Sequence, residues 1–265
     1  MGKSRVLRAN WYEYPQYYDI AVQTYTRREA DFIEAAFQKH CPFRVRRLLE
    51  PACGTGRLIR EFAARRYDMI GFDLNRRMLD YLRRRLARRG LDGEIFEADM
   101  ADFRLRRRVD AAYCTVSTFR HLLSEKEAHR HLNCVAQSLR QGGVYILGLH
   151  LLPSITPKND VQCWEERRGE TQVTANLRVL RIDRRRRLER FRIELLIRRR
   201  AMKFRLRHEF VFRTYTGKQF RQLLLSVPAL ELCGVYDLRY GLEQAPTPIG
   251  EMPYSSFVLR RRVRS

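Results

Sequence analysis

Apolar residues along the first 150 positions fall into short runs separated by stretches of helical spacing. The runs predict strands over 45–51, 69–74, 94–98, 110–116 and 144–150. Between them, apolar residues recur every three or four positions, which predicts helices over 57–66, 76–89 and 124–139. Ser124, with Glu127 three residues later, is a capping box that marks the start of the last helix. Strands and helices that alternate in this way predict a parallel sheet with right-handed helical crossovers.

After residue 150 the pattern changes to a period of two. Three runs alternate apolar and charged side chains, and arginine-rich turns separate them; these runs are residues 172–183, 188–197 and 202–214. This alternation predicts an antiparallel meander with one apolar face and one solvated face. A helix over 216–225 and two strands over 230–238 and 255–263 are predicted to close the chain.

The predicted fold class is therefore α/β: a Rossmann-like, seven-stranded, mainly parallel sheet with an inserted antiparallel β-meander lid. We expect residues 1–152 and 214–265 to form the sheet domain and residues 153–213 to form the inserted lid. Because loops and insertions carry specificity on such scaffolds, we expect the meander to contribute to substrate choice.

The composition supports a folded chain with a substantial core, since 45% of the 265 residues are hydrophobic and 11% are aromatic. No apolar run approaches the ~20 residues that span a bilayer, and the first residues lack an apolar signal core. We therefore expect a cytoplasmic protein with no membrane partner. The six cysteines form no Cys-x-x-Cys pair and no zinc-like cluster with histidine, so we expect free thiols and no metal site.

The formal net charge is +23, and 47 of the 53 basic residues are arginine. A charge of this size can indicate a nucleic-acid binder. The arginines are spread over the whole chain, however, and clusters such as residues 83–85 lie on the outer face of a predicted helix. We interpret most of them as solvated surface, and nucleic acid remains a possible partner that the sequence does not favour. No oligomeric state is predicted.

The segment LLEPACGTGRLIREF, residues 48–62, is a glycine turn between a predicted strand and a predicted helix. Such a turn after the first strand can bind a nucleotide-like ligand at the carboxyl ends of the strands. Gly54 and Gly56 are followed by Ile59 where a dinucleotide site has its third glycine, and no Lys-Ser/Thr pair follows to make a P-loop. The remaining candidate is a ligand that carries adenosine but no phosphates.

Acidic residues at the ends of successive strands support this choice. Asp73 ends the second strand, where a carboxylate can accept hydrogen bonds from ribose hydroxyls. Asp99 ends the third strand and can accept from an adenine amino group, while Met100 packs on the ring. Glu50 precedes the glycine turn and can face a ligand ammonium. Each acid alone can instead cap the following helix, but the ordered set favours a ligand site.

With these motifs, the chain resembles class I S-adenosylmethionine-dependent methyltransferases over residues 45 to about 150. The resemblance rests on LLEPACGTGR, IGFDLNRRML, FEADMADF and VDAAYCTVSTFRHL. It implies that the cofactor is S-adenosyl-L-methionine and that the enzyme transfers a methyl group. It also implies that the cofactor site contains Glu50, Ala52, Gly54, Gly56, Asp73, Leu74, Asp99, Met100 and Thr115. Ala52 stands where the commonest family pattern has a glycine.

A narrower resemblance, carried by YYDIAVQTYTRREADF and by the position of the meander, is to small-molecule N-methyltransferases. It implies that Tyr18 closes over the cofactor and that Arg28 pairs with the cofactor carboxylate. His121 lies beyond the fourth strand, where the substrate is expected, and is the candidate catalytic residue that orients or deprotonates it.

We therefore expect methyl transfer to a small-molecule nucleophile, first of all an amine. Two alternatives stay open: an RNA methyltransferase that uses the arginine-rich surface, and a non-catalytic protein that only binds the cofactor. Against methylation of a base amine, CTVSTF follows the fourth strand where an Asn/Asp-Pro-Pro-aromatic motif would be needed.

Overall fold

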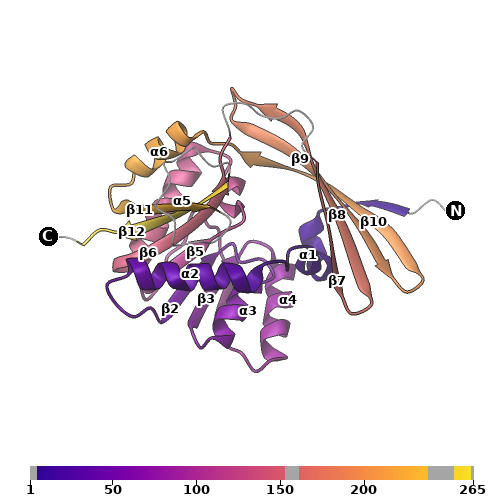
Figure 1. Ribbon diagram of the computed structural model, residues 1–265, viewed down its shortest axis with the longest axis horizontal. Coiled ribbons are helices and arrows are strands. Elements are labelled where there is room, and N and C mark those ends of the chain that lie inside the picture. The colour runs from indigo at the N-terminus through magenta and orange to yellow at the C-terminus, as the bar shows by residue number, and fades with distance from the viewer. Residues whose placement is uncertain (1–4, 153–160, 238–253, 264–265) are drawn as a thin grey trace.

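The computed structural model describes residues 5–152, 161–237 and 254–263, which form two β-sheets joined by a helical segment near the N-terminus (Figure 1). The larger sheet has seven strands in the order β11-β12-β6-β5-β2-β3-β4. Their bounds are β2 Arg47–Pro51, β3 Asp68–Asp73, β4 Glu94–Glu97, β5 Val109–Cys114, β6 Leu139–His150, β11 Leu230–Asp237 and β12 Tyr254–Arg261. Only β12 runs antiparallel to its neighbours. The predicted seven-stranded, mainly parallel sheet is confirmed.

Helices cover both faces of this sheet (Figure 1). One face packs against α2 (Thr26–His40), α3 (Arg57–Ala64) and α4 (Arg76–Ala87), and the other against α5 (Glu125–Ser138) and α6 (Gly217–Leu225). The apolar spacing of each helix explains its orientation, because the residues at that spacing are the buried ones. Phe62 and Leu82 on one face and Leu132 and Phe220 on the other are fully buried.

The local start signals act as the sequence indicates. Ser124 and Glu127 form the expected capping box at the start of α5. One detail differs: the strand predicted over residues 144–150 starts earlier, because β6 already begins at Leu139. The register against β5 shifts here, so that the two glycines at 142 and 143 lie in a bulge inside the strand. Gly142 is suited to it, because its φ is +77° and its backbone packs against Pro42.

The second sheet, called the lid sheet below, has five strands in the order β1-β10-β9-β8-β7. Their bounds are β1 Arg5–Arg8, β7 Val161–Arg168, β8 Thr171–Asp183, β9 Leu188–Arg199 and β10 Met202–Arg213. The predicted meander accounts for β8, β9 and β10, and its apolar face is buried as expected. The sequence did not predict β7, a largely exposed edge strand, or β1, which pairs in parallel with β10.

The segment between β1 and α2 bridges the two sheets (Figure 1). It contains a 3₁₀ turn, η1 (Trp11–Glu13), and a short helix, α1 (Pro15–Ala21). Asp19 of α1 is buried and forms ion pairs with Arg85 of α4 and Arg168 of β7. Trp164 of β7 donates its indole N–H to the carbonyl of Ala21 at 2.7 Å. This segment therefore fixes the lid sheet against the larger sheet.

The sequence predicts neither a membrane-spanning segment nor a metal site, and the structure describes residues 5–152, 161–237 and 254–263. Within these residues, no helix is both long and apolar enough to cross a membrane. The same residues contain no group of three or more His, Cys, Asp or Glu side chains that could hold a metal ion. The six cysteines are free thiols.

Candidate active site

The glycine turn after β2 has an unusual backbone conformation. Ala52, Gly54 and Gly56 all have positive φ, at 51°, 53° and 63°. Gly56 packs against Leu82, so closely that an added Cβ would lie 2.2 Å from its Cδ1. An added Cβ on Gly54 would meet only the Tyr18 ring, at 3.9 Å. Ala52 thus adopts a left-handed conformation that glycine reaches with less strain, while Gly54 leaves room between the turn and the Tyr18 ring.

Asp73 connects the end of β3 to this turn. Its Oδ2 accepts a hydrogen bond from the backbone N–H of Gly54 at 2.8 Å, and its Oδ1 accepts from the N–H of Asn75 at 2.8 Å. Burial raises the pKa of the Asp73 carboxyl, and these N–H groups oppose the rise. Because an ionised carboxylate accepts about four hydrogen bonds, two sites remain for a ligand. Leu74, the next residue, is 64% exposed.

The other predicted cofactor residues end neighbouring strands at the same edge of the sheet. Asp99, just after β4, is exposed and accepts from the backbone N–H of Ala101 at 2.7 Å. Met100 beside it is buried. Thr115 directly follows β5. Parallel strands bring their carboxyl ends to one edge, so the topology gathers these residues around the glycine turn.

A buried charged cluster lies behind the turn. Arg57, the first residue of α3, pairs with Glu29 of α2 at 2.5 Å between Nη2 and Oε2. Glu50 accepts a hydrogen bond from the Tyr113 hydroxyl at 3.1 Å, and burial raises the pKa of Glu50 to about 8. Arg57 Nη1 and Glu29 Oε1 are both buried without a hydrogen-bond partner.

The sequence resemblance points to Arg28, and not to Arg57, as the residue that pairs with the cofactor carboxylate. Arg28 is exposed on α2, whereas the Arg57 side chain is only 12% exposed. The signal that could have identified Arg57 is its position directly after Gly56, where the first turn of the helix faces the ligand side of the loop.

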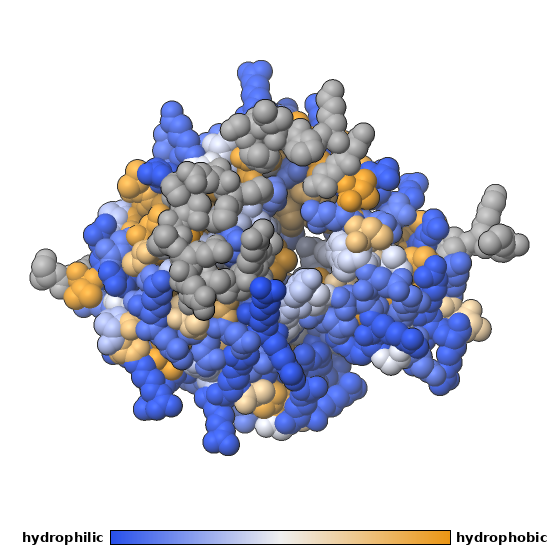
Figure 2. Space-filling model, viewed as in Figure 1, coloured by the Kyte–Doolittle hydropathy of each residue, from blue (hydrophilic) through white to orange (hydrophobic). Residues whose placement is uncertain are grey.

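Aromatic and imidazole rings gather between the glycine turn and the lid sheet. We call this set the aromatic group; it comprises Trp11, Tyr12, Tyr18, His121, His208, Phe210 and Phe212. The ring centroid of Tyr18 lies 4.9 Å from that of Trp11 and 5.4 Å from that of Tyr12. Burial raises the pKa of Tyr18 to about 12, so its hydroxyl stays protonated. The surface is hollowed between the two sheets (Figure 2).

His121 belongs to this group. It ends the 3₁₀ turn η2 (Thr118–His121), and its Nε2 lies 3.0 Å from the Tyr12 hydroxyl oxygen. Its ring contacts Phe212 of the lid sheet at a centroid distance of 4.7 Å. Burial, with the nearby Arg120 and His208, lowers the pKa of His121 to about 4. The imidazole is therefore neutral near pH 7.

The chain reaches η2 through a strained turn. Val116 and Ser117 have φ of +54° and +63°, a region that β-branched residues such as Val rarely adopt. Ser117 is held against β6, because its N–H donates to the carbonyl of Gly148 at 3.0 Å and its Oγ accepts from the N–H of His150 at 3.1 Å. Strain of this kind persists only where the surrounding structure enforces it.

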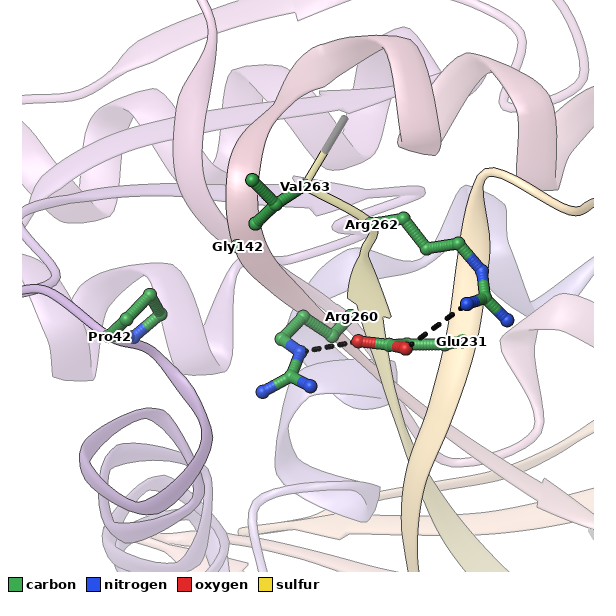
Figure 3. Close-up of a pocket in the computed structure, with 6 residues that line it drawn as sticks. All are labelled: Pro42, Gly142, Glu231, Arg260, Arg262 and Val263. Carbon is green, nitrogen blue, oxygen red and sulfur yellow. Dashed lines mark hydrogen bonds and ion pairs between the residues drawn. The ribbon is translucent and has the colours of Figure 1, made fainter. Parts of the chain in front are cut away.

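A separate pocket opens at the opposite edge of the seven-stranded sheet, where β6 and β11 begin (Figure 3). It is lined by Pro42, Gly142, Glu231, Arg260, Arg262 and Val263. Glu231 pairs with Arg260 at 2.7 Å and with Arg262 at 3.5 Å. None of the predicted site residues contributes to this pocket.

Comparison with known proteins adds independent information. The model of a family described as Methyltransferase domain matches residues 48–143. A relative from Streptomyces fradiae, dTDP-3-amino-3,6-dideoxy-alpha-D-glucopyranose N,N-dimethyltransferase, is 31% identical over 166 residues, which cover 61% of this chain and 63% of the relative. A relative from Streptomyces venezuelae, dTDP-3-amino-3,4,6-trideoxy-alpha-D-glucopyranose N,N-dimethyltransferase, is 33% identical over 100 residues, covering 38% of this chain and 40% of the relative. The chain thus spans less than two thirds of the length of these curated relatives.

The likeness in structure extends further than the likeness in sequence. The crystal structure of a S-adenosylmethionine-dependent methyltransferase from Clostridium acetobutylicum ATCC 824 matches with a TM-score of 0.78 and 17% identity. The match covers 96% of this chain and 99% of that one, so the shared fold includes the lid sheet as well as the larger sheet.

Proposed function

We propose that this chain, whose residues 48–143 match a methyltransferase domain, uses S-adenosylmethionine to methylate an amine on a small molecule. One observation carries the proposal: an unbroken set of contacts leads from the glycine turn to His121. Tyr18 lies over Gly54, contacts the ring of Tyr12, and Tyr12 in turn hydrogen-bonds to His121. A cofactor at the turn would therefore face an acceptor held beside His121.

The residues at the sheet edge fit the cofactor. Asp73 has two acceptor sites left for the ribose hydroxyls, and Gly54 leaves open space for a close approach to backbone. The unpartnered atoms of Arg57 and Glu29 offer one positive and one negative group for the amino-acid end. In our proposal the adenine contacts Asp99 and Met100. The other positions proposed for the cofactor site are Tyr18, Arg28, Glu50, Ala52, Gly56, Leu74 and Thr115.

When bound, the cofactor supplies a methyl group already activated by the sulfonium. The protein then needs mainly to align the nucleophile and exclude water. An amine must be neutral to attack, and a dry aromatic surrounding favours the neutral form because burial disfavours an ammonium. His121 is neutral in this surrounding, with a pKa near 4, so it is poorly suited to remove a proton from an ammonium. We propose that it orients the neutral amine through a hydrogen bond.

The names of both curated relatives describe N,N-dimethylation of an amino sugar carried on dTDP. On this basis the finer proposal is that the acceptor is an amine on a nucleotide-linked sugar. The aromatic group suits a saturated ring, whose apolar faces can pack on Trp11 and Phe210 while its polar groups reach Tyr12 and His121.

The test is to incubate the purified chain with S-adenosylmethionine and a panel of acceptors: amino sugar nucleotides, free amino sugars, simple amines and RNA. Formation of S-adenosylhomocysteine, together with a mass gain of one or two methyl groups on an amine, is the expected result. Methylation of RNA, with RNA affinity that falls steeply with salt, would move the acceptor to nucleic acid. Failure to bind either S-adenosylmethionine or S-adenosylhomocysteine would overturn the proposal altogether.

A further inference from the structure

We propose that the buried ion pair between Arg120 and Glu189 is a positioning device that fixes His121 against the lid sheet. The inference rests on the proposed function, because His121 is the residue that orients the acceptor there. Arg120 precedes His121 in η2, and Glu189 belongs to β9. The pair therefore connects the acceptor turn with the lid across a long span of sequence.

Arg120 is enclosed by lid residues on several sides. Its side chain is 4% exposed and that of Glu189 is 7% exposed. Nη2 of Arg120 pairs with Oε2 of Glu189, and its Nε donates to the backbone carbonyl of Arg213 at 2.9 Å. The guanidinium carbon also lies 5.0 Å from the ring centroid of Phe212. A planar group with several fixed donors sets both the distance and the orientation of η2 relative to the lid.

Phe212 connects this pair directly with the acceptor site. The same ring that lies under Arg120 meets the His121 imidazole edge-on, at a centroid distance of 4.7 Å. A displacement of β10 relative to η2 would therefore move the contacts of both residues together. The imidazole of His121 is therefore positioned by its contact with Phe212 of the lid sheet and by the backbone that joins it to Arg120.

The turn is anchored at its start, where Ser117 hydrogen-bonds to β6, and this anchor lies four residues before His121. Val116 and Ser117 hold strained left-handed conformations, and η2 is a single 3₁₀ turn with short-range hydrogen bonds such as Arg120 N–H to Ser117 O at 2.9 Å. On the far side of His121, Arg213 donates to the carbonyl of Leu123 at 2.8 Å and pairs with Glu125. Glu125 is 47% exposed, so that contact is partly solvated. Of these two ion pairs, the one made by Arg120 is the more buried.

Stability alone does not account for burying two charges here. Removing an arginine and a carboxylate from water carries a large desolvation cost, and apolar replacements of similar volume often stabilise a protein as well or better. Such a pair can still select one geometry among several of similar energy, because each partner is satisfied only when the other is correctly placed. This distinction provides the test.

The experiment uses the double variant Arg120→Met/Glu189→Leu, which removes both charges and leaves neither unpaired. We expect it to fold and to bind S-adenosylmethionine as the wild type does, but to turn over the amine acceptor at least about tenfold more slowly, because misplacement lowers kcat. The matched control is Arg192→Met/Glu209→Leu, a more exposed pair of the same residue types that joins β9 to β10. It should keep wild-type turnover.

A second measurement needs no acceptor. The NMR titration of the His121 imidazole should move upward from its low pKa in the Arg120→Met/Glu189→Leu variant, because the ring gains water and loses the neighbouring charge of Arg120. His40, which hydrogen-bonds to Tyr236 on another part of the molecule, serves as the internal reference and should titrate unchanged.

These two measurements separate the two ideas. If the wild type methylates no amine but the His121 pKa also rises in Arg120→Lys, which keeps the charge, the proposed function fails and the positioning inference stands. If the wild type is active and the double variant matches it in kcat and in the His121 titration, the positioning inference is overturned. Should the double variant not fold, Arg120→Lys replaces it. Arg120→Lys keeps the charge but loses the planar guanidinium group that reaches Glu189 and the Arg213 carbonyl together. Wild-type kcat with an unchanged His121 pKa in this variant would equally overturn the inference.

Discussion

Replacing Asp73 by asparagine tests the cofactor edge of the site most directly. The carboxylate receives one backbone hydrogen bond at each oxygen, from Gly54 and from Asn75, both at 2.8 Å. Two acceptor sites remain for the ribose in our proposal. Asparagine preserves one carbonyl oxygen but puts an NH₂ group in place of the other. In either orientation the NH₂ group therefore faces a backbone N–H, that of Gly54 or that of Asn75, and acceptor capacity for the ribose is lost.

The expected magnitude follows from this count. A hydrogen bond to a charged group contributes about 1.5–3 kcal/mol. Since about 1.4 kcal/mol corresponds to a factor of ten in affinity, loss of one such bond should raise Kd for S-adenosylmethionine about 10- to 100-fold. Isothermal titration calorimetry with S-adenosylmethionine and S-adenosylhomocysteine measures this change without any acceptor.

The control is Asp80→Asn. It removes an exposed carboxylate of α4 that pairs with Arg83 three residues later, so it removes one negative charge, as Asp73→Asn does, without touching the site. It should leave Kd within about twofold of the wild type. If Asp73→Asn also bound both ligands within twofold of the wild type while remaining folded, Asp73 would be only a loop-organising residue and the reasoning would be refuted.

Three further changes test other parts of the site. His121→Gln should lower kcat about tenfold at unchanged cofactor affinity. It should not remove a limb of the pH–rate profile near neutrality, because the imidazole has a pKa of about 4 and is already neutral there. Loss of such a limb would identify His121 as a base instead. Burial raises the pKa of Glu50 from 4.5 to about 8, so the folded chain holds a proton that the unfolded chain releases, and the free energy of unfolding should fall as pH rises between these values. Urea unfolding of Glu50→Gln should lack this decrease with pH. A decrease that persists would assign it to other groups. Ala52→Gly should stabilise the fold by about 0.5–1 kcal/mol because φ is +51° there, whereas Ala35→Gly in the interior of α2 should destabilise it by about 1 kcal/mol. A melting temperature lowered by the first change would contradict the argument.

Local patterns in the sequence were sufficient for most of the framework. The apolar runs located the strands of the larger sheet, and the glycine turn with Asp73 could be placed because both lie at strand ends that the topology brings together. The alternation in residues 188–197 and 202–214 identified both the meander and its buried face. In each case the signal is carried by neighbours in the chain, within one element or one turn.

What the sequence did not predict depends on contacts between distant segments. β7 is mostly exposed, and β1 is a four-residue strand, so neither has a pattern strong enough to separate it from a loop. The hydrogen bond between Tyr12 and His121 joins residues 109 positions apart. The burial of Glu189 among apolar neighbours on β9 likewise makes sense only once Arg120 is known to meet it.

The short strand at the start of the described chain has a practical consequence. Arg5–Arg8 cover only Phe204–Arg207 on the outer side of β10, yet they shield that part of a twelve-residue strand from pairing with another molecule. The same stretch leads directly into Trp11 and Tyr12, which lie in the aromatic group of the proposed acceptor site. Deleting residues 5–8 would therefore expose an unpaired strand edge and remove the strand that precedes Trp11 and Tyr12.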